Sequence, residues 1–216
     1  MANIELIHGN SLDAIKKYKD NHFDCAIVDP PYGMGKNTYG SGTKKTPSKF
    51  DCSKYNHRQW DIAPNKLYFD ELFRVSKNQI IFGANYYPQY LKPSMGWVVW
   101  DKDNTGGFSD GELAYTSFNQ KLRIYKFRWN GMLQENMKNK EVRIHPTQKP
   151  IALYKWLLEN YTKEGDLILD THLGSGSIAI ACYYMKRKLI GYEIDKEYYD
   201  NACKRFKQQT MQSALW

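Results

Sequence analysis

The chain has 216 residues, of which 42% are hydrophobic and 15% are aromatic, and its formal charge is +8. This length supports one well-filled core, so we expect a single domain over residues 1–216, and no apolar stretch approaches the length of a membrane span. The basic charge, 17 tyrosines and 6 tryptophans fit a partner with phosphates and bases, although many soluble proteins without such a partner are equally basic.

Apolar runs alternate with helical segments along the chain. The runs that predict strands are residues 4–8, 23–28, 79–82, 97–100, 113–118, 123–127, 167–169 and 188–194. The segments that predict helices are residues 12–19, 58–76, 151–161, 178–186 and 196–208. This alternation favours an α/β fold with a mostly parallel sheet covered on both faces. The runs at 113–118 and 123–127 predict an antiparallel hairpin at the sheet edge.

One segment departs from this regularity directly after the second strand. Residues 33–57 combine glycines with lysines, a composition too flexible and polar to bury. They predict either a mobile basic loop over a substrate or an ordinary surface loop, and the composition fits both.

The four cysteines are Cys25, Cys52, Cys182 and Cys203. They show no C-x-x-C spacing, and none has a histidine at the distance typical of zinc ligands. Free thiols in a reducing cytoplasm and no metal site are therefore expected. The N-terminus also lacks the basic and apolar segments of a secretion signal. We therefore expect a cytoplasmic protein without a membrane partner.

The tetrapeptide Asp29-Pro30-Pro31-Tyr32 follows the buried strand predicted at residues 23–28. In open α/β sheets, ligands bind beyond the carboxyl ends of the strands, which is where this tetrapeptide would lie. Because proline has no amide hydrogen, this rim offers mainly acceptors, namely the Asp29 carboxylate and the Pro30 carbonyl. They suit an amino group that donates both hydrogens, and the Tyr32 ring suits a flat heterocycle. The tetrapeptide predicts a site for an aromatic amine.

A strand, a glycine-rich turn and a helix starting at residue 177 or 178 are predicted within residues 166–186. Gly174 and Gly176 would let the backbone approach a ligand closely. The next strand leads to Glu193, about 20 residues on, where a carboxylate accepts hydrogen bonds from ribose hydroxyls. These features predict a nucleoside-cofactor site. Two alternatives are a turn with no ligand and a nicotinamide dinucleotide site, since the glycine spacing also matches that fingerprint.

Two further motifs precede predicted helices. His145-Pro146-Thr147-Gln148-Lys149-Pro150 leads into the helix at 151–161, with Thr147 as its expected cap and Pro150 in its first turn. Its amide hydrogens could bind an anion. Near the start of the chain, Asn10 or Ser11 is expected to cap the first helix.

Together these motifs resemble those of the DNA amino-methyltransferases, which transfer a methyl group from S-adenosylmethionine to the exocyclic nitrogen of adenine or cytosine. Residues 29–32 match the catalytic motif, and residues 145–150 match a second motif at all six positions. The catalytic motif comes first, as in the beta class, and the likeness covers nearly the whole chain. It implies a Rossmann-like methyltransferase fold with a circularly permuted motif order and a seven-stranded sheet in which one strand is antiparallel.

The resemblance assigns roles to individual residues. The implied catalytic residues are Asp29, Pro30, Pro31 and Tyr32. The implied cofactor-binding residues are Asn10, Asp29, His145, Thr147, Gln148, Asp170, Gly174, Ser175, Gly176 and Glu193. Family members usually have proline and phenylalanine where this chain has Thr171 and His172, which weakens the case for a stacking contact there. We interpret His172 as a polar residue satisfied within its own loop.

The implied reaction is methylation of adenine N6 on a base that has rotated out of duplex DNA. The alternatives are cytosine N4, RNA as substrate, and a catalytically silent nucleic-acid-binding subunit. Family members acting on cytosine more often have serine where Asp29 stands, which favours adenine. The implied target-recognition segment, at about 129–144, is very short and predicts a short or permissive target. The resemblance leaves open a homodimer and a cognate restriction nuclease, in a bacterial or phage-infected cell.

Overall fold

The computed structural model of the chain describes residues 3–33, 62–104, 109–130 and 133–211. The elements are, in order, β1 (Ile4–His8), α1 (Ser11–Ile15), β2 (Phe23–Val28), α2 (Lys66–Val75), β3 (Ser76–Phe82), the 3₁₀ turns η3 (Ala84–Tyr86) and η4 (Pro88–Tyr90), β4 (Trp97–Asp101), β5 (Gly111–Thr116), β6 (Arg123–Lys126), β7 (Trp129–Asn130), β8 (Leu133–Gln134), α3 (Ile151–Tyr161), β9 (Leu167–Asp170), α4 (Ser177–Tyr184), β10 (Lys188–Glu193) and α5 (Lys196–Met211). Most of the loop predicted at 33–57 lies outside the described residues.

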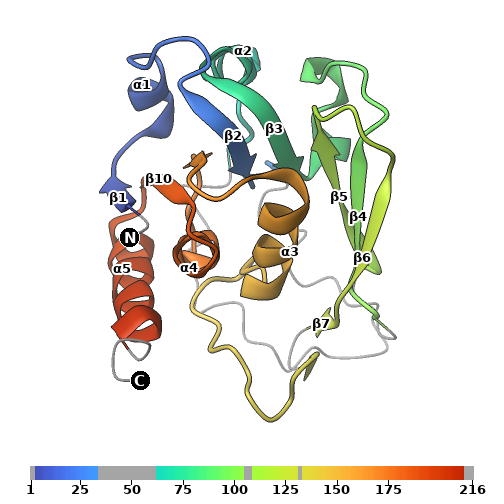
Figure 1. Ribbon diagram of the computed structural model, residues 1–216, viewed down its shortest axis with the longest axis vertical. Helices are drawn as coiled ribbons and strands as arrows, with labels where there is room; N and C mark the ends of the chain where they lie inside the picture. The colour runs from blue at the N-terminus through green and yellow to red at the C-terminus, as the bar shows by residue number, and fades with distance from the viewer. Residues whose placement is uncertain (1–2, 34–61, 105–108, 131–132, 212–216) are drawn as a thin grey trace.

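The described strands form one large sheet and a small ribbon (Figure 1). The large sheet has eight strands in the order β1-β10-β9-β2-β3-β5-β4-β6, and β7 pairs with β8 in the ribbon. Among these eight strands, β5 alone runs antiparallel to its neighbours. The mostly parallel α/β sheet with one antiparallel strand is therefore confirmed, while the predicted number of seven strands is wrong.

Two apolar layers cover the sheet, because successive side chains of a buried strand point to opposite faces. On β2, Cys25 and Ile27 pack with residues of α3 and α4, whereas Ala26 and Val28 pack with residues of α1 and α2. Both layers are fully buried at the centre of the sheet. The near-continuous apolar sequence of β2 follows from this two-sided burial.

The hairpin predicted between residues 113–118 and 123–127 is wrong. β4 lies between β5 and β6, pairing antiparallel with β5 and parallel with β6. Val98 and Trp100 of β4 are buried, whereas β6 is mostly exposed and suits the sheet edge. The chain after β5 crosses beside Gly96, where an added Cβ would lie 2.6 Å from the Phe118 carbonyl oxygen. The missing side chain at Gly96 makes room for this crossing.

The chain leaves β2 and β9 in opposite directions across the sheet. From β2 it continues through α2 to β3 on one side, and from β9 through α4 to β10 on the other. In open α/β sheets such a switch point opens a crevice at the carboxyl ends of the two strands. The tetrapeptide at 29–32 and the glycine turn at 171–176 both begin there.

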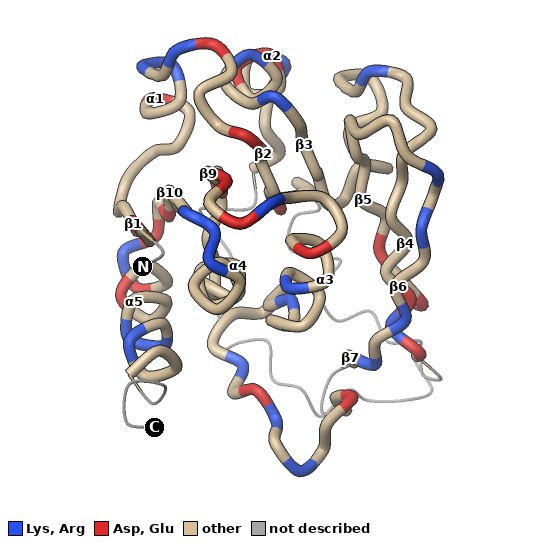
Figure 2. The backbone as a smooth tube through the Cα atoms, viewed as in Figure 1, with Lys and Arg blue, Asp and Glu red and all other residues tan. Residues whose placement is uncertain are grey.

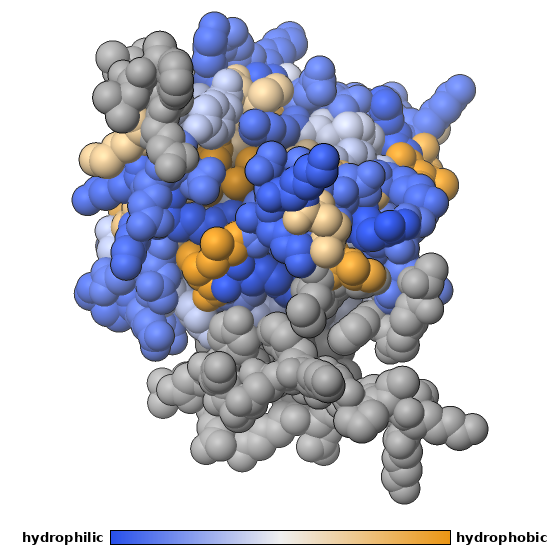
Figure 3. Space-filling model, turned by 90° about the horizontal axis from the view of Figure 1, so that it is seen from below, coloured by the Kyte–Doolittle hydropathy of each residue, from blue (hydrophilic) through white to orange (hydrophobic). Residues whose placement is uncertain are grey.

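No helix within the described ranges is long and apolar enough to cross a membrane. The face seen from below is largely hydrophilic, with small, separate hydrophobic patches (Figure 3).

Candidate active site

A cavity of about 240 Å³ lies at the carboxyl ends of β2, β9 and β10. Its walls are formed by Gly9, Asn10, Ser11, Asp29, Pro30, Pro31, Tyr32, Ile62, His145, Thr147, Gln148, Lys149, Tyr154, Thr171, His172, Leu173, Gly174, Ser175, Glu193, Ile194 and Tyr198. The cavity thus joins the tetrapeptide to the glycine turn. Of the predicted site residues, all of which are described, Asp170 and Gly176 do not line it.

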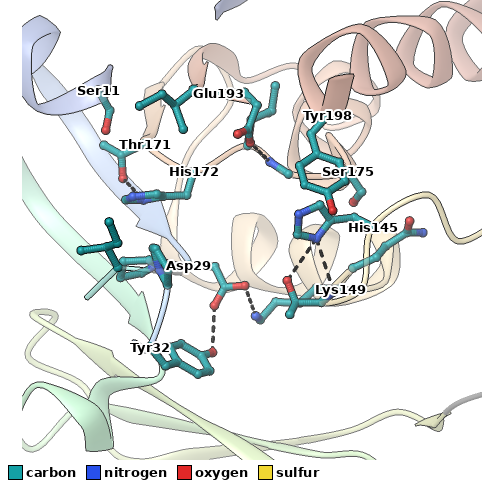
Figure 4. Close-up of a pocket in the computed structure, with 18 of the residues that line it drawn as sticks. Ser11, Asp29, Tyr32, His145, Lys149, Thr171, His172, Ser175, Glu193 and Tyr198 are labelled. Carbon is teal, nitrogen blue, oxygen red and sulfur yellow. Dashed lines mark hydrogen bonds and ion pairs between the residues drawn. The ribbon is translucent and has the colours of Figure 1, made fainter. Parts of the chain in front are cut away.

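The Asp29 carboxylate belongs to a cluster of charged groups in which Lys149 is buried and the other members are partly exposed (Figure 4). Its Oδ1 accepts a hydrogen bond of 2.9 Å from the Tyr32 hydroxyl, and its Oδ2 accepts one from Lys149 Nζ. Lys149 Nζ also lies 3.2 Å from Glu112 Oε2 on β5. Glu112 Oε1 in turn accepts a hydrogen bond of 2.6 Å from Lys102. No local motif in the sequence marks Glu112 or Lys102, so their participation was not predicted.

Burial and charge act differently on the members of this cluster. Burial raises the pKa of Asp29, and the nearby Lys149 ammonium opposes this without cancelling it. Burial also disfavours the charged form of Lys149, but Asp29 and Glu112 keep the pKa of this amine above its ordinary value. For Glu112, Lys149 and Lys102 outweigh burial and lower the pKa to about 2. Asp29 is therefore the carboxyl of the cluster that protonates first as the pH falls.

Tyr32 is fixed on three sides. Its hydroxyl binds Asp29, and its ring stacks on Tyr86 with centroids 4.6 Å apart and an interplanar angle of 13°. Gly83, with φ of +64°, lies so close that an added Cβ would overlap the Tyr32 ring. Tyr86, which the sequence analysis did not single out, therefore covers one face of the ring predicted to stack on a base.

The Pro30 carbonyl also has a protein partner. The Tyr87 hydroxyl lies 3.2 Å from the Pro30 carbonyl oxygen and donates to the Pro31 carbonyl as well. Tyr87 thus holds the backbone of the tetrapeptide in place. Both acceptors predicted for the amine, Asp29 and Pro30, line the cavity and already accept hydrogen bonds from the protein.

Glu193 lies at the end of β10 and closes the opposite side of the cavity. Its Oε2 accepts a hydrogen bond of 2.8 Å from Gly174 N–H, and its Oε1 accepts one of 3.0 Å from Asp195 N–H. Burial raises its pKa, and these backbone hydrogen bonds oppose the increase. Each carboxylate oxygen has a further lone pair for a ligand hydroxyl.

The two glycines of the turn have different surroundings. Gly174, with φ of +52°, lines the cavity, and an added Cβ would lie 3.6 Å from the His145 ring. Gly176, with φ of +71°, caps α4, and an added Cβ would lie 3.2 Å from Ala202 Cβ on α5. Gly176 therefore permits the turn and the packing of α5 rather than a contact with the cavity.

The carboxyl group of Asp170 is buried beneath the turn. It accepts a hydrogen bond of 3.0 Å from His172 N–H, and burial raises its pKa to about 8. Thr171 Oγ1 lies 2.6 Å from the Tyr68 hydroxyl and 2.9 Å from His172 Nδ1. Burial lowers the pKa of His172 to about 4, so its ring is neutral at pH 7. His172 is satisfied within its loop, as interpreted, but its ring also lines the cavity.

The hexapeptide precedes α3, but Thr147 does not cap this helix. Thr147 Oγ1 lies 3.1 Å from His145 Nδ1, and Pro150 is the N-cap rather than part of the first turn. The free amide of Ile151 instead donates to Glu141 Oε1 at 3.0 Å. A carboxylate ten residues earlier thus does the work expected of Thr147, and the local sequence does not reveal it.

Gln148 and Asn10 both combine a structural contact with a place on the cavity wall. Gln148 Oε1 accepts a hydrogen bond of 2.9 Å from Ile144 N–H, which fixes the segment before the hexapeptide. Asn10 caps α1, because its side chain accepts a hydrogen bond of 2.9 Å from Leu12 N–H. The expected cap at Asn10 is therefore confirmed.

The family model N6_N4_Mtase, described as DNA methylase, matches residues 87–204. The type II methyltransferase M.HpaI of Haemophilus parainfluenzae is 30% identical over 94% of this chain and 74% of its own length. The DNA adenine methyltransferase YhdJ of Escherichia coli is 26% identical over 97% of this chain and 84% of its own length. A crystal structure of the M1.HpyAVI-SAM complex superposes with a TM-score of 0.55 and 22% identity, covering 94% of this chain and 99% of the other. This last likeness shows a shared fold.

Proposed function

The chain belongs to the N6/N4 family of DNA methylases, and we propose that it transfers a methyl group from S-adenosylmethionine to N6 of adenine in DNA. The observation that carries the proposal is one cavity with Asp29 and Tyr32 on one side and Gly174 and Glu193 on the other. A flat amine and a nucleoside cofactor could meet in it. The proposed catalytic and cofactor-binding residues are those that line this cavity.

The residues present fit the cofactor. Gly174 leaves the space that a Cβ would fill, and Glu193 can accept hydrogen bonds from ribose hydroxyls. The carboxyl groups of Asp29 and Glu193 favour a positively charged ligand. When bound, S-adenosylmethionine supplies a methyl group on a positively charged sulfur. The M1.HpyAVI-SAM complex, which has the same fold, supports this choice of cofactor.

Asp29 and the Pro30 carbonyl would hold the two hydrogens of the target amine. The amine is a weak nucleophile because its lone pair is delocalised into the ring. Two acceptors that hold both hydrogens would draw the nitrogen toward tetrahedral geometry, which would direct its lone pair at the methyl group. The new nitrogen–carbon bond would form as the methyl–sulfur bond of the donor breaks, and the nitrogen would stay positive until one of its protons leaves. A preorganised carboxylate such as Asp29 would stabilise this charge by roughly 3 to 4 kcal/mol.

Adenine is proposed as the target base because the tetrapeptide begins with Asp29 rather than serine. The printed name of YhdJ, a DNA adenine methyltransferase, supports the same choice. Digestion of the methylated DNA to nucleosides, followed by mass spectrometry, would identify the product. We expect N6-methyladenine. Detection of N4-methylcytosine instead would show that cytosine, and not adenine, is the target base.

DNA is proposed to approach over the ribbon β7-β8 and the segment that leads to the hexapeptide. Lys and Arg residues lie on β6, directly before β7 at Arg128, and in the segment between β8 and the hexapeptide (Figure 2). Trp129 ties the ribbon to the site, because its Nε1 donates a hydrogen bond of 2.9 Å to the Gln148 carbonyl. Rotating a base out of the duplex costs a few kcal/mol, and stacking on the cavity wall would recover part of that cost.

A cognate restriction nuclease is proposed as a partner because M.HpaI is named a type II methyltransferase. Because M.HpaI comes from a bacterium, we also propose that the protein acts in the cytoplasm of a bacterial or phage-infected cell. A homodimer stays a prediction from the sequence, as does the single domain over residues 1–216.

Incubation of unmodified DNA with methyl-labelled S-adenosylmethionine tests the proposed function. We expect label in the DNA with the wild-type protein and none with Asp29→Ala, while calorimetry should show that Asp29→Ala still binds the cofactor. Asp70→Ala is the matched control, because Asp70 pairs with Lys66 on the exposed surface of α2. Near-normal transfer by Asp29→Ala would remove Asp29 from the catalytic role. Cofactor binding by the wild-type protein without transfer to any DNA would favour the silent binding subunit.

A further inference from the structure

Lys149 already donates a hydrogen bond to the Asp29 carboxylate, which the target amine must reach. Its Nζ donates to Asp29 Oδ2, and its side chain is only 3% exposed. The Phe82 ring lies beneath this ammonium, with its centroid 4.6 Å from Nζ. A neutral amine is a weaker donor than an ammonium, so it replaces Lys149 on Asp29 only if the lysine has another acceptor nearby.

Glu112 is that acceptor. Its Oε2 is buried and lies 3.2 Å from Lys149 Nζ, yet within the described part of the chain it makes no well-oriented hydrogen bond. Its Oε1 is held by Lys102, so the carboxylate keeps its place. A small movement of the Lys149 ammonium toward Glu112 would complete the hydrogen bond to Oε2 and free Asp29 Oδ2.

We propose that Lys149 is a positioning residue that exchanges partners in each turnover, resting on Asp29 in the free enzyme and moving onto Glu112 when the target amine binds Asp29. The inference rests on the proposed function of Asp29. Two carboxylates face two ammonium groups in both states, so the cluster around the buried Lys149 stays neutral throughout. This neutrality matters because a buried charge without a partner is strongly destabilising.

The titratable groups that face Asp29 come from several elements. They are Lys149 before α3, Glu112 on β5 with its partner Lys102, Asp170 on β9, and the hydroxyls of Tyr32, Tyr68 and Tyr154. Lys149 and Glu112 are the two whose removal changes the charge at Asp29 in opposite senses. Their variants therefore provide the test.

The two variants should move the pH dependence of methyl transfer in opposite directions. Lys149→Met leaves Asp29 beside Glu112 without their shared cation, so the pKa of Asp29 rises and activity is lost at a higher pH than in the wild type. Glu112→Gln removes the negative neighbour, so the acid limb of the profile moves to lower pH. Glu112→Gln also removes the charged acceptor to which Lys149 would move. The target amine then competes less well with Lys149 for Asp29, and the KM for DNA rises.

The experiment measures kcat and KM for transfer from methyl-labelled S-adenosylmethionine to unmodified phage DNA across the pH range. We expect shifts of about one pH unit, upward for Lys149→Met and downward for Glu112→Gln. Glu112→Gln should also raise the KM for DNA about tenfold, with an unchanged Kd for the cofactor. The double variant should return the acid limb toward the wild-type position, because both charges are gone.

Two controls separate this exchange from a structural role. Lys149→Arg keeps the cation and should leave the acid limb near its wild-type position, and Lys66→Met on the exposed face of α2 should change nothing. Shifts in the same direction for both single variants, or no shifts, would overturn the inference while methyl transfer itself stands. If Lys149→Met does not fold, the Glu112→Gln and Lys149→Arg profiles still decide it. Failure of the wild-type protein to label any DNA would overturn the proposed function and this inference together.

Discussion

Replacing Gly83 by alanine should destabilise the fold by forcing the Tyr32 ring out of place. Gly83 has φ of +64°, and an added Cβ would overlap Tyr32 Cε1 and lie 2.5 Å from its Cζ. The ring cannot retreat without losing its hydrogen bond to Asp29 and its stacking on Tyr86. Left-handed backbone at a non-glycine residue costs about 1–2 kcal/mol, and overpacking adds about 1–3 kcal/mol. We expect the free energy of unfolding to fall by about 2–5 kcal/mol in all.

Gly165→Ala is the matched control. Gly165 has φ of +88°, but an added Cβ there meets nothing within 4 Å, so this variant carries the backbone strain alone. Urea unfolding followed by tryptophan fluorescence gives both free energies. In a Tyr32→Ala background the steric part disappears, and Gly83→Ala should then cost no more than Gly165→Ala. Equal costs for the two glycine variants in the wild-type background would refute the contact between Gly83 and Tyr32.

Tyr32→Ala should weaken methyl transfer more than Tyr32→Phe or Tyr32→Trp in steady-state kinetics, and equal losses would argue against stacking of the base. Burial raises the pKa of Asp170 to about 8, so the folded state holds a proton that the unfolded state releases above about pH 4. Stability should therefore fall as the pH rises through this interval; melting curves of Asp170→Asn should lack this fall, and parallel curves for the two proteins would contradict it. Arg205→Met would leave the partly exposed Glu141 without its buried cation and should lower the free energy of unfolding in urea by about 3 kcal/mol; a loss as small as the roughly 0.5 kcal/mol of the exposed Lys66→Met would show that the pair is not essential.

The sequence predicted the meeting of the two main motifs, because both lie at strand ends. β1, β2 and α3 have the predicted bounds, since each apolar run is limited by polar or turn-forming residues. β2 and β9 are neighbours and run parallel, so Asp29 and the turn at 171–176 reach the same edge. The physical rule that carboxyl ends of parallel strands share an edge was sufficient there.

The surroundings of Asp29 were not predictable in the same way. Glu112 faces Lys149 because β5 is inserted between β3 and β4, whereas the expected hairpin would have put β5 at the sheet edge. That placement depends on which strands have a neighbouring strand on each side. It also depends on the space that Gly96 leaves for the chain that crosses beside it after β5. Neither feature appears in local periodicity. The same limit applies to Glu141, whose contact with Ile151 joins segments with no shared pattern.

The departure from the family motif at Thr171 and His172 is compatible with a positively charged cofactor. A histidine on the cavity wall would repel the sulfonium if it were protonated, but burial lowers its pKa to about 4. Its Nδ1 contacts Thr171 Oγ1, which also contacts the Tyr68 hydroxyl, so the ring is held by a short chain of hydrogen bonds from α2. A neutral ring fixed in this way offers a flat, uncharged surface on the cavity wall. The substitution therefore keeps the electrostatic condition for cofactor binding, and Tyr68 provides the support that an apolar ring would obtain from packing.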